Sequence, residues 1–96
     1  MAIYSIYGHV LRAVDAEISR AAQSYPSFHS QHEGYAVLKE ESDELWDRIK
    51  ASKGLKSDGV TAVEAVQVAA MAVRFVLDLC DPDEFAAAWD DYEQTR

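Results

Sequence analysis

Apolar residues recur along this chain at steps of three and four positions, which is the pattern of amphipathic helices. A first helix from about Ala2 to Ser24 is predicted by the apolar series Ile3, Tyr7, Val10, Val14, Ile18 and Ala21. Pro26 follows shortly after this series and predicts the end of the helix, because proline cannot continue the backbone hydrogen-bond ladder.

Two capping-box spacings mark where the next two helices begin. Ser30 stands three residues before Glu33, which predicts a second helix that ends near Ser52. Thr61 stands three residues before Glu64 and predicts the start of a third helix. The glycine- and serine-containing segment between these two helices is predicted to be a loop.

The third helix is predicted to reach Cys80, and a fourth follows directly. Asp81 is a favourable N-cap, and Pro82 suits the first helical position, so we predict a short helix to about Glu93. No segment alternates with a period of two, so no sheet is expected. The prediction is an all-α protein, a four-helix bundle forming a single domain over residues 1–96.

Size and charge limit the classes of partner. The chain has 96 residues, of which 49% are hydrophobic, enough for one core. Small domains bury a modest share of their surface and often associate, so we expect a homo-oligomer, either a dimer or a tetramer. Nine Lys and Arg against seventeen Asp and Glu give a net charge of −8. This balance argues against binding to nucleic acid or to an anionic membrane, which require basic surfaces.

The third predicted helix is apolar enough to raise the question of a membrane span. It contains Glu64, Arg74 and Asp78, and each charge near the centre of a span costs about 2.5–3.5 kcal/mol. A buried helix of a soluble protein is therefore the preferred interpretation. The single cysteine, Cys80, excludes an intrachain disulfide, and no signal peptide is recognisable, so we expect a cytoplasmic protein.

Carboxylates interrupt the apolar stripe of the second helix. Glu41 falls within the stripe between Leu38 and Leu45, and Glu44 lies one turn further along the same face. Glu40 adds a third carboxylate beside them. Closely spaced carboxylates on an apolar face are costly unless they are paired or bind a metal, and they are the hard oxygen ligands that suit Mg²⁺.

The polar residues of the third helix share one face. Their spacing of three, seven and four residues places the following side chains in one stripe: Glu64, Gln67, Arg74 and Asp78. A single polar stripe on an otherwise apolar helix must face water or a polar site. We predict that it faces the carboxylates of the second helix.

Simpler interpretations of the same residues remain open at this point. Glu44 and Arg48 are four apart and could form a surface salt bridge. Glu64 could be no more than the third position of a capping box. Arg74 and Asp78 could pair with each other along the helix.

The spacing of the acidic residues resembles a known signature. Glu40-Glu41-x-x-Glu44 on one helix, followed by Glu64-x-x-Gln67 on the next, resembles the EExxE and ExxD motifs of the MazG-like all-α nucleoside triphosphate pyrophosphohydrolases. The resemblance extends over about residues 30–78. It implies a MazG-type fold and the hydrolysis of nucleoside triphosphates to monophosphates and pyrophosphate. The reaction would depend on Mg²⁺, with Mn²⁺ as a substitute, and would serve nucleotide-pool housecleaning.

The resemblance also implies roles for individual residues. Glu41, Glu44 and Glu64 correspond to metal ligands, and Gln67 stands at the position of the fourth ligand. Glu40 would orient or deprotonate the attacking water, or hold a further Mg²⁺. Gln67 departs from the family pattern, in which this position is Asp, and it removes one negative charge. This departure leaves open a catalytically weak or inactive module that binds a nucleotide or a protein, and a purely structural bundle.

Substrate-binding residues are less clearly marked. No basic cluster suited to phosphates is evident, so Arg74 and a loop lysine, Lys53 or Lys56, are the candidates for that contact. His32, near the start of the second helix, and Trp46, in its second half, are candidates for a base pocket. The alternatives are a plain surface position for His32 and core packing for Trp46.

Overall fold

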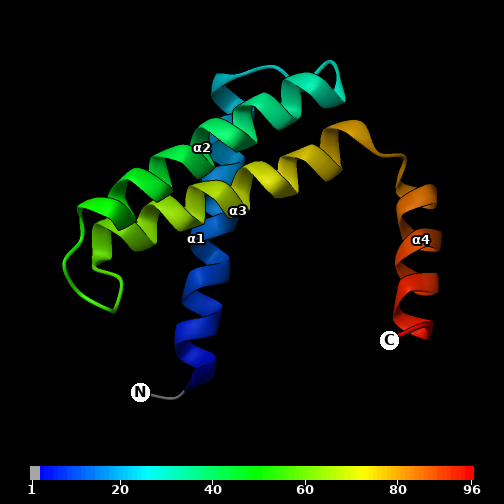
Figure 1. Cartoon of the computed structure of the whole chain (residues 1–96). Helices are drawn as coiled ribbons and strands as arrows, with labels where there is room; N and C mark the ends of the chain where they lie inside the picture. Colours follow the sequence, from blue (N-terminus) through cyan, green and yellow to red (C-terminus); the bar gives the residue numbers. More distant parts are fainter. Residues whose placement is uncertain (1–2) are drawn as a thin grey trace.

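Four helices make up the part of the chain that the structure describes. The computed structural model describes the backbone of residues 3–96 and the side chains from Ser5 onward. In this range it contains no strand, and its helices are α1 (Ile3–Ser24), α2 (Gln31–Ala51), α3 (Gly59–Leu79) and α4 (Pro82–Gln94) (Figure 1). The predicted all-α class is confirmed. The predicted start of the first helix at Ala2 lies outside the described residues.

The predicted N-caps fix where α2 and α4 begin. The Ser30 hydroxyl accepts a hydrogen bond from the backbone N–H of Glu33 at 3.1 Å. The Asp81 carboxylate accepts from the N–H groups of Asp83 and Glu84, and Pro82 occupies the first turn. These bonds satisfy backbone donors that have no partner within the helix, and they therefore set where each helix begins.

The start of α3 differs from the prediction. Its N-cap is Asp58, whose Oδ1 accepts from the N–H of Thr61 at 2.7 Å, so the helix begins at Gly59. Thr61 lies inside the first turn and is buried. A carboxylate is an equally good cap, and capping by Asp58 allows Thr61 to pack in the interior. Glu64 is consequently not the acidic member of a capping box.

Three helices pack together and α4 stands apart. α2 and α3 run antiparallel and side by side, while α1 crosses α3 (Figure 1). α4 makes no substantial contact with the other three, so one chain forms a bundle of three helices with a fourth projecting from it. The core consists of buried Phe28, Ala70 and Met71, surrounded by partly buried Val14, Ile18, Ala21, Val37, Leu38 and Leu79.

A glycine permits the close approach of α2 to α3. A Cβ atom on Gly34 would lie 2.8 Å from Cδ2 of Phe75, 3.0 Å from Cδ1 of Leu79 and 3.2 Å from Cδ2 of Phe28. All three distances are shorter than an ordinary van der Waals contact. The absence of a side chain at Gly34 therefore sets how tightly the two helices that carry the acidic residues can pack.

Arg74 of α3 hydrogen-bonds to the segment that connects α1 to α2. The buried guanidinium donates through Nη2 to the carbonyl oxygen of Pro26 at 2.9 Å and to Oδ2 of Asp78 at 3.3 Å. It also lies over the ring of Phe28, with 4.6 Å between Cζ and the ring centroid. Oδ2 of Asp78 accepts from the N–H of Phe28 at 3.0 Å. The alternative interpretation in which Arg74 pairs with Asp78 is confirmed, although the pair is buried and not solvated. Together these contacts hold the loop that precedes α2 against α3.

Candidate metal centre

Three carboxylates from two helices converge where α2 and α3 pack side by side. One carboxylate oxygen from each of Glu41, Glu44 and Glu64 lies within 4.8 Å of the others. Glu41 and Glu44 are three residues apart on α2, so they share a face. Glu64 reaches them from α3 because the two helices run antiparallel and in contact. The predicted approach of the third helix's polar stripe to the carboxylates of α2 is thus confirmed for Glu64.

The carboxylates of this cluster repel one another. Partial burial raises the pKa of Glu41, and the negative charges of Glu44, Glu64 and Glu40 raise it further. Glu41 and Glu64 are half-buried, and Glu44 is exposed. Across the described side chains, no Lys, Arg or His forms an ion pair with any of these three residues.

The donor set of the cluster fits a divalent cation. Carboxylate oxygens are the hard ligands preferred by Mg²⁺ and Mn²⁺, and a bound cation would remove the repulsion that raises the pKa of Glu41. Mg²⁺ usually retains several waters and takes only a few carboxylates from the protein. Three carboxylates on two rigid helices, with one open to solvent, provide such a set.

A cavity of about 590 Å³ lies beside the cluster, where α1, α2 and α3 meet. Its wall near the cluster includes Glu40 and Glu41, and Gln67 and Arg74 contribute from α3. The apolar part of the lining is formed by Ala21, Phe28, Val37 and Met71. A largely apolar cavity of this size with a few polar groups is typical of small-molecule sites.

Gln67 is held by a residue of α1. Its Nε2 donates to Oε2 of Glu17 at 2.8 Å, and the same carboxylate pairs with Arg20. Glu17 and Arg20 both line the cavity. Sequence reasoning did not identify Glu17, although a signal was present, because Glu17 stands between Val14 and Ile18 within the apolar stripe of α1 as Glu41 does in α2.

Arg48 is a second residue whose position was not predicted. It borders a hollow of about 330 Å³ together with Glu44, Asp47 and Glu64. A salt bridge between Glu44 and Arg48 does not occur among the ion pairs of the described residues. The structure therefore places a guanidinium at the edge of the acidic cluster, where sequence reasoning considered it only as the partner of Glu44.

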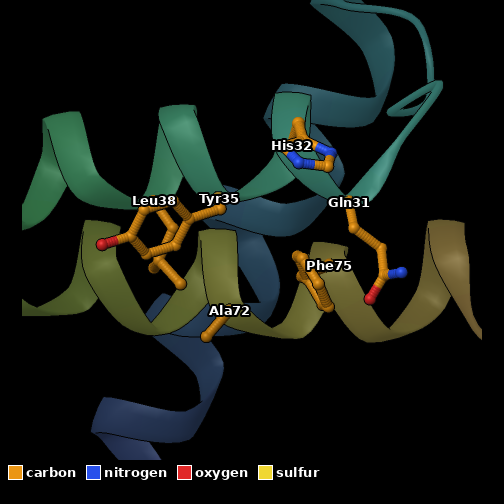
Figure 2. Close-up of a pocket in the computed structure, with 6 residues that line it drawn as sticks. All are labelled: Gln31, His32, Tyr35, Leu38, Ala72 and Phe75. Carbon is orange, nitrogen blue, oxygen red and sulfur yellow. The ribbon is translucent and has the colours of Figure 1, made fainter.

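Two of the proposed substrate contacts, His32 and Trp46, lie away from the cavity. His32 lines a separate groove with Tyr35 and Phe75 (Figure 2), on the side of α2 away from Glu40 and Glu41. Trp46 is 54% exposed and lies under the Nζ of Lys50, 5.7 Å from the ring centroid. The alternative of core packing for Trp46 is therefore wrong. Helical geometry separates these residues from the cluster, because they occupy the opposite face of α2.

The loop lysines are also exposed. Lys53 lies in the α2–α3 connection and lines neither the cavity nor the hollow beside Glu44. Lys56 borders another depression, at the far end of the α2–α3 pair. The structure thus brings Glu41, Glu44 and Glu64 together, and it places Glu40, Gln67 and Arg74 around the neighbouring cavity that Glu41 also lines. His32, Trp46 and Lys53 lie outside both groups. Comparisons of the chain with protein-family models, curated proteins and solved structures find no match.

Proposed function

We propose that this chain is a Mg²⁺-dependent nucleoside triphosphate pyrophosphohydrolase of the MazG-like type and fold, acting in the cytoplasm on the nucleotide pool. The observation that supports it is the convergence of Glu41, Glu44 and Glu64 beside a cavity of about 590 Å³. The cluster suits a cation that carries a triphosphate, and the cavity has the size of a nucleoside pocket.

The acidic residues take two different roles, metal binding and activation of the attacking water. Glu41, Glu44 and Glu64 would hold the cation. When bound, Mg²⁺ neutralises phosphate oxygens and lowers the pKa of coordinated water. Glu40 lines the cavity one residue before Glu41 and is exposed, so it can orient a water and accept its proton. The water oxygen attacks the α-phosphorus, the bond to the bridging oxygen breaks, and pyrophosphate leaves.

The remaining groups recognise the substrate. The apolar lining contributed by Phe28 and Met71 packs against the base, and the Glu17–Gln67 pair offers polar atoms at its edge. Arg48, at the edge of the acidic cluster, contacts phosphate oxygens that the cation leaves free. Arg74 holds the cavity wall through Pro26 rather than acting as a free phosphate ligand.

Pyrophosphate release from a panel of NTPs and dNTPs, with Mg²⁺ or Mn²⁺, tests this proposal. Glu41→Gln should lower kcat/KM by about 10²-fold or more, the typical effect of losing one electrostatic contact to a transition state. Glu93→Gln on α4, which removes an exposed carboxylate far along the chain, is the matched control and should retain full activity. Equal turnover by Glu41→Gln and wild type would refute the assignment.

A binding module without turnover is the second candidate, and Gln67 is the observation that favours it. Its amide carries no charge, and its Nε2 is already engaged by Glu17. Calorimetry that detects Mg²⁺-dependent nucleotide binding, with no product after long incubation, would support the module. Gln67→Asp should then raise turnover if the missing charge is the cause. A thermal midpoint unmoved by Mg²⁺ and nucleotide would instead favour a purely structural bundle.

A further inference from the structure

The cavity of about 590 Å³ beside the acidic cluster has walls from three helices. Glu40 and Glu41 line it from α2, whereas Glu17 lines it from α1 and Gln67 from α3. In the proposed function the triphosphate lies at the cluster that contains Glu41, so the base extends into the cavity between α1 and α3. This placement of the base, on which the inference depends, rests on the proposed function.

Glu17 retains the capacity to accept two more hydrogen bonds. Its side chain is 18% exposed, its Oε1 pairs with Nη1 of Arg20, and its Oε2 accepts from Nε2 of Gln67 at 2.8 Å. Among the described residues these are the two hydrogen bonds that Glu17 accepts through its side chain. An ionised carboxylate has about four lone-pair sites, so one site remains on each oxygen. Two parallel N–H groups of a ligand can therefore bind side by side to this carboxylate.

Two further charged side chains of the lining, Glu33 and Arg74, are held by the loop that precedes α2. Oε1 of Glu33 accepts from the backbone N–H of His29 at 3.1 Å, and Nη2 of Arg74 donates to a loop carbonyl oxygen at 2.9 Å. Arg20, in contrast, has a side chain that is 65% exposed, and a guanidinium carries five N–H donors. The charged groups that remain for the base are therefore the acceptors of Glu17 and the donors of Arg20 beside them.

We propose that Glu17 makes this cavity selective for guanine, so that the substrates are GTP and dGTP. Guanine is the one common base whose Watson–Crick edge presents two adjacent donors, N1–H and the N2 amine, which suit a bidentate pair with one carboxylate. Its O6 lies next to N1 and accepts from Arg20. The remaining lining includes the apolar side chains of Ala21, Val37 and Met71, which cover the faces of the purine ring.

The other bases interact less favourably with the same carboxylate. Adenine and cytosine present one donor beside a ring nitrogen that accepts, and uracil and thymine present one donor between two carbonyl oxygens. In each case an acceptor of the base faces an oxygen of Glu17, so a hydrogen bond is replaced by repulsion. Hypoxanthine, the base of inosine, keeps N1–H and O6 but lacks the N2 amine. It therefore differs from guanine by a single hydrogen bond to a charged acceptor, which corresponds to at least about tenfold in affinity.

A purely structural role for Glu17 predicts no preference among bases. Its hydrogen bond with Gln67 joins α1 to α3, and in that role it would stabilise the packing of the two helices with any ligand. Substituting Glu17 would then weaken the binding of all nucleosides by the same factor. The ratio of two affinities, rather than either affinity alone, therefore distinguishes base recognition from helix packing.

Titration of the full chain with free nucleosides in EDTA, followed by NMR chemical shifts, tests the base pocket without phosphate or metal. Guanosine should bind wild type at least about tenfold more tightly than inosine, and adenosine and uridine should bind more weakly still. Glu17→Gln, which replaces one acceptor by a donor, should bring guanosine and inosine to within about twofold of each other. Asp15→Asn removes an exposed carboxylate from the same helix, away from the cavity lining, and should keep the wild-type ratio.

Pyrophosphate release by wild type distinguishes failure of the guanine selectivity from failure of the proposed function. GTP should have a higher kcat/KM than ITP and ATP, mainly through a lower KM. Release at equal kcat/KM from all NTPs would overturn the selectivity and leave the pyrophosphohydrolase intact, whereas guanosine selectivity without any release would support the pocket and refute the hydrolase. Wild type that does not distinguish guanosine from inosine overturns the proposal, whether or not Glu17→Gln folds.

Discussion

The repulsion within the acidic cluster predicts that Glu41→Gln stabilises the metal-free protein and abolishes its proposed activity. Glu41→Gln deletes a half-buried negative charge that lies within 4.8 Å of two others. At that separation two like charges repel by about 0.9 kcal/mol at the dielectric constant of water, and by roughly 3.5 kcal/mol at a dielectric constant of 20. Allowing for solvent screening at a partly exposed cluster, we expect a net gain of about 1–2 kcal/mol.

This gain should be visible in thermal melts. For a domain of this size, 1 kcal/mol corresponds to about 4–8 °C, so Glu41→Gln should melt about 4–16 °C above wild type in EDTA. Mg²⁺ at ten times its dissociation constant stabilises the protein that binds it by about 1.4 kcal/mol. Added Mg²⁺ should therefore raise the midpoint of wild type and leave that of Glu41→Gln unchanged, so that the difference between them narrows.

Circular dichroism at 222 nm, with both proteins at one concentration, measures these four midpoints. Glu93→Gln, at an exposed position on α4, should follow wild type in EDTA and in Mg²⁺. The reasoning fails if Glu41→Gln melts below wild type in EDTA, since that would mean that Glu41 stabilises the metal-free fold. It fails also if Mg²⁺ shifts both midpoints equally.

Three further outcomes follow from the same geometry. Because the pKa of Glu41 is raised in the folded state, metal-free wild type should gain stability as pH falls from neutrality through that pKa, and Glu41→Gln should lack this gain in pH-dependent melts. The pKa of Asp58 is lowered by its hydrogen bonds with Thr61, so its stabilising effect should be present above the ordinary carboxyl pKa and vanish as pH falls through the lowered value. Asp58→Ala should thus lower the midpoint by a few degrees at pH 7 and have no effect in strong acid, and an unchanged midpoint at pH 7 would contradict the capping role. Arg74→Met leaves the Asp78 carboxylate without its buried partner, so the free energy of unfolding measured by urea denaturation should fall by about 3–5 kcal/mol. If the variant keeps its stability and loses substrate binding, Arg74 is instead a phosphate ligand.

Local signals were sufficient to predict most helix boundaries. Ser30 and Asp81 cap their helices through hydrogen bonds to residues two or three positions away, so both partners are encoded within one turn of sequence. At the start of α3 the capping-box spacing of Thr61 and Glu64 was the predicted signal, whereas the structure uses Asp58 as the cap. Tertiary packing accounts for the difference, because capping by Asp58 allows Thr61 to be buried.

The candidate site was only partly encoded in the same way. Glu41 and Glu44 share a face because helical periodicity fixes residues three apart, which the sequence alone determines. The approach of Glu64 required α3 to run antiparallel to α2 at a close distance, which depends on Gly34 lacking a side chain. The contact of Gln67 with Glu17 joins residues fifty positions apart and could not be predicted from spacing.

The sequence by itself determined the helical class, most of the caps and the carboxylate pair on α2, because these depend on periodicity and on hydrogen bonds within one turn. Only the tertiary structure decided that α1 supplies Glu17 to the cavity and that His32 and Trp46 lie away from it. It also decided that, in the part of the chain that the structure describes, α4 makes no substantial contact with α1, α2 or α3. These outcomes depend on which helix faces meet, and that is set by long-range burial of apolar surface, which no local pattern specifies.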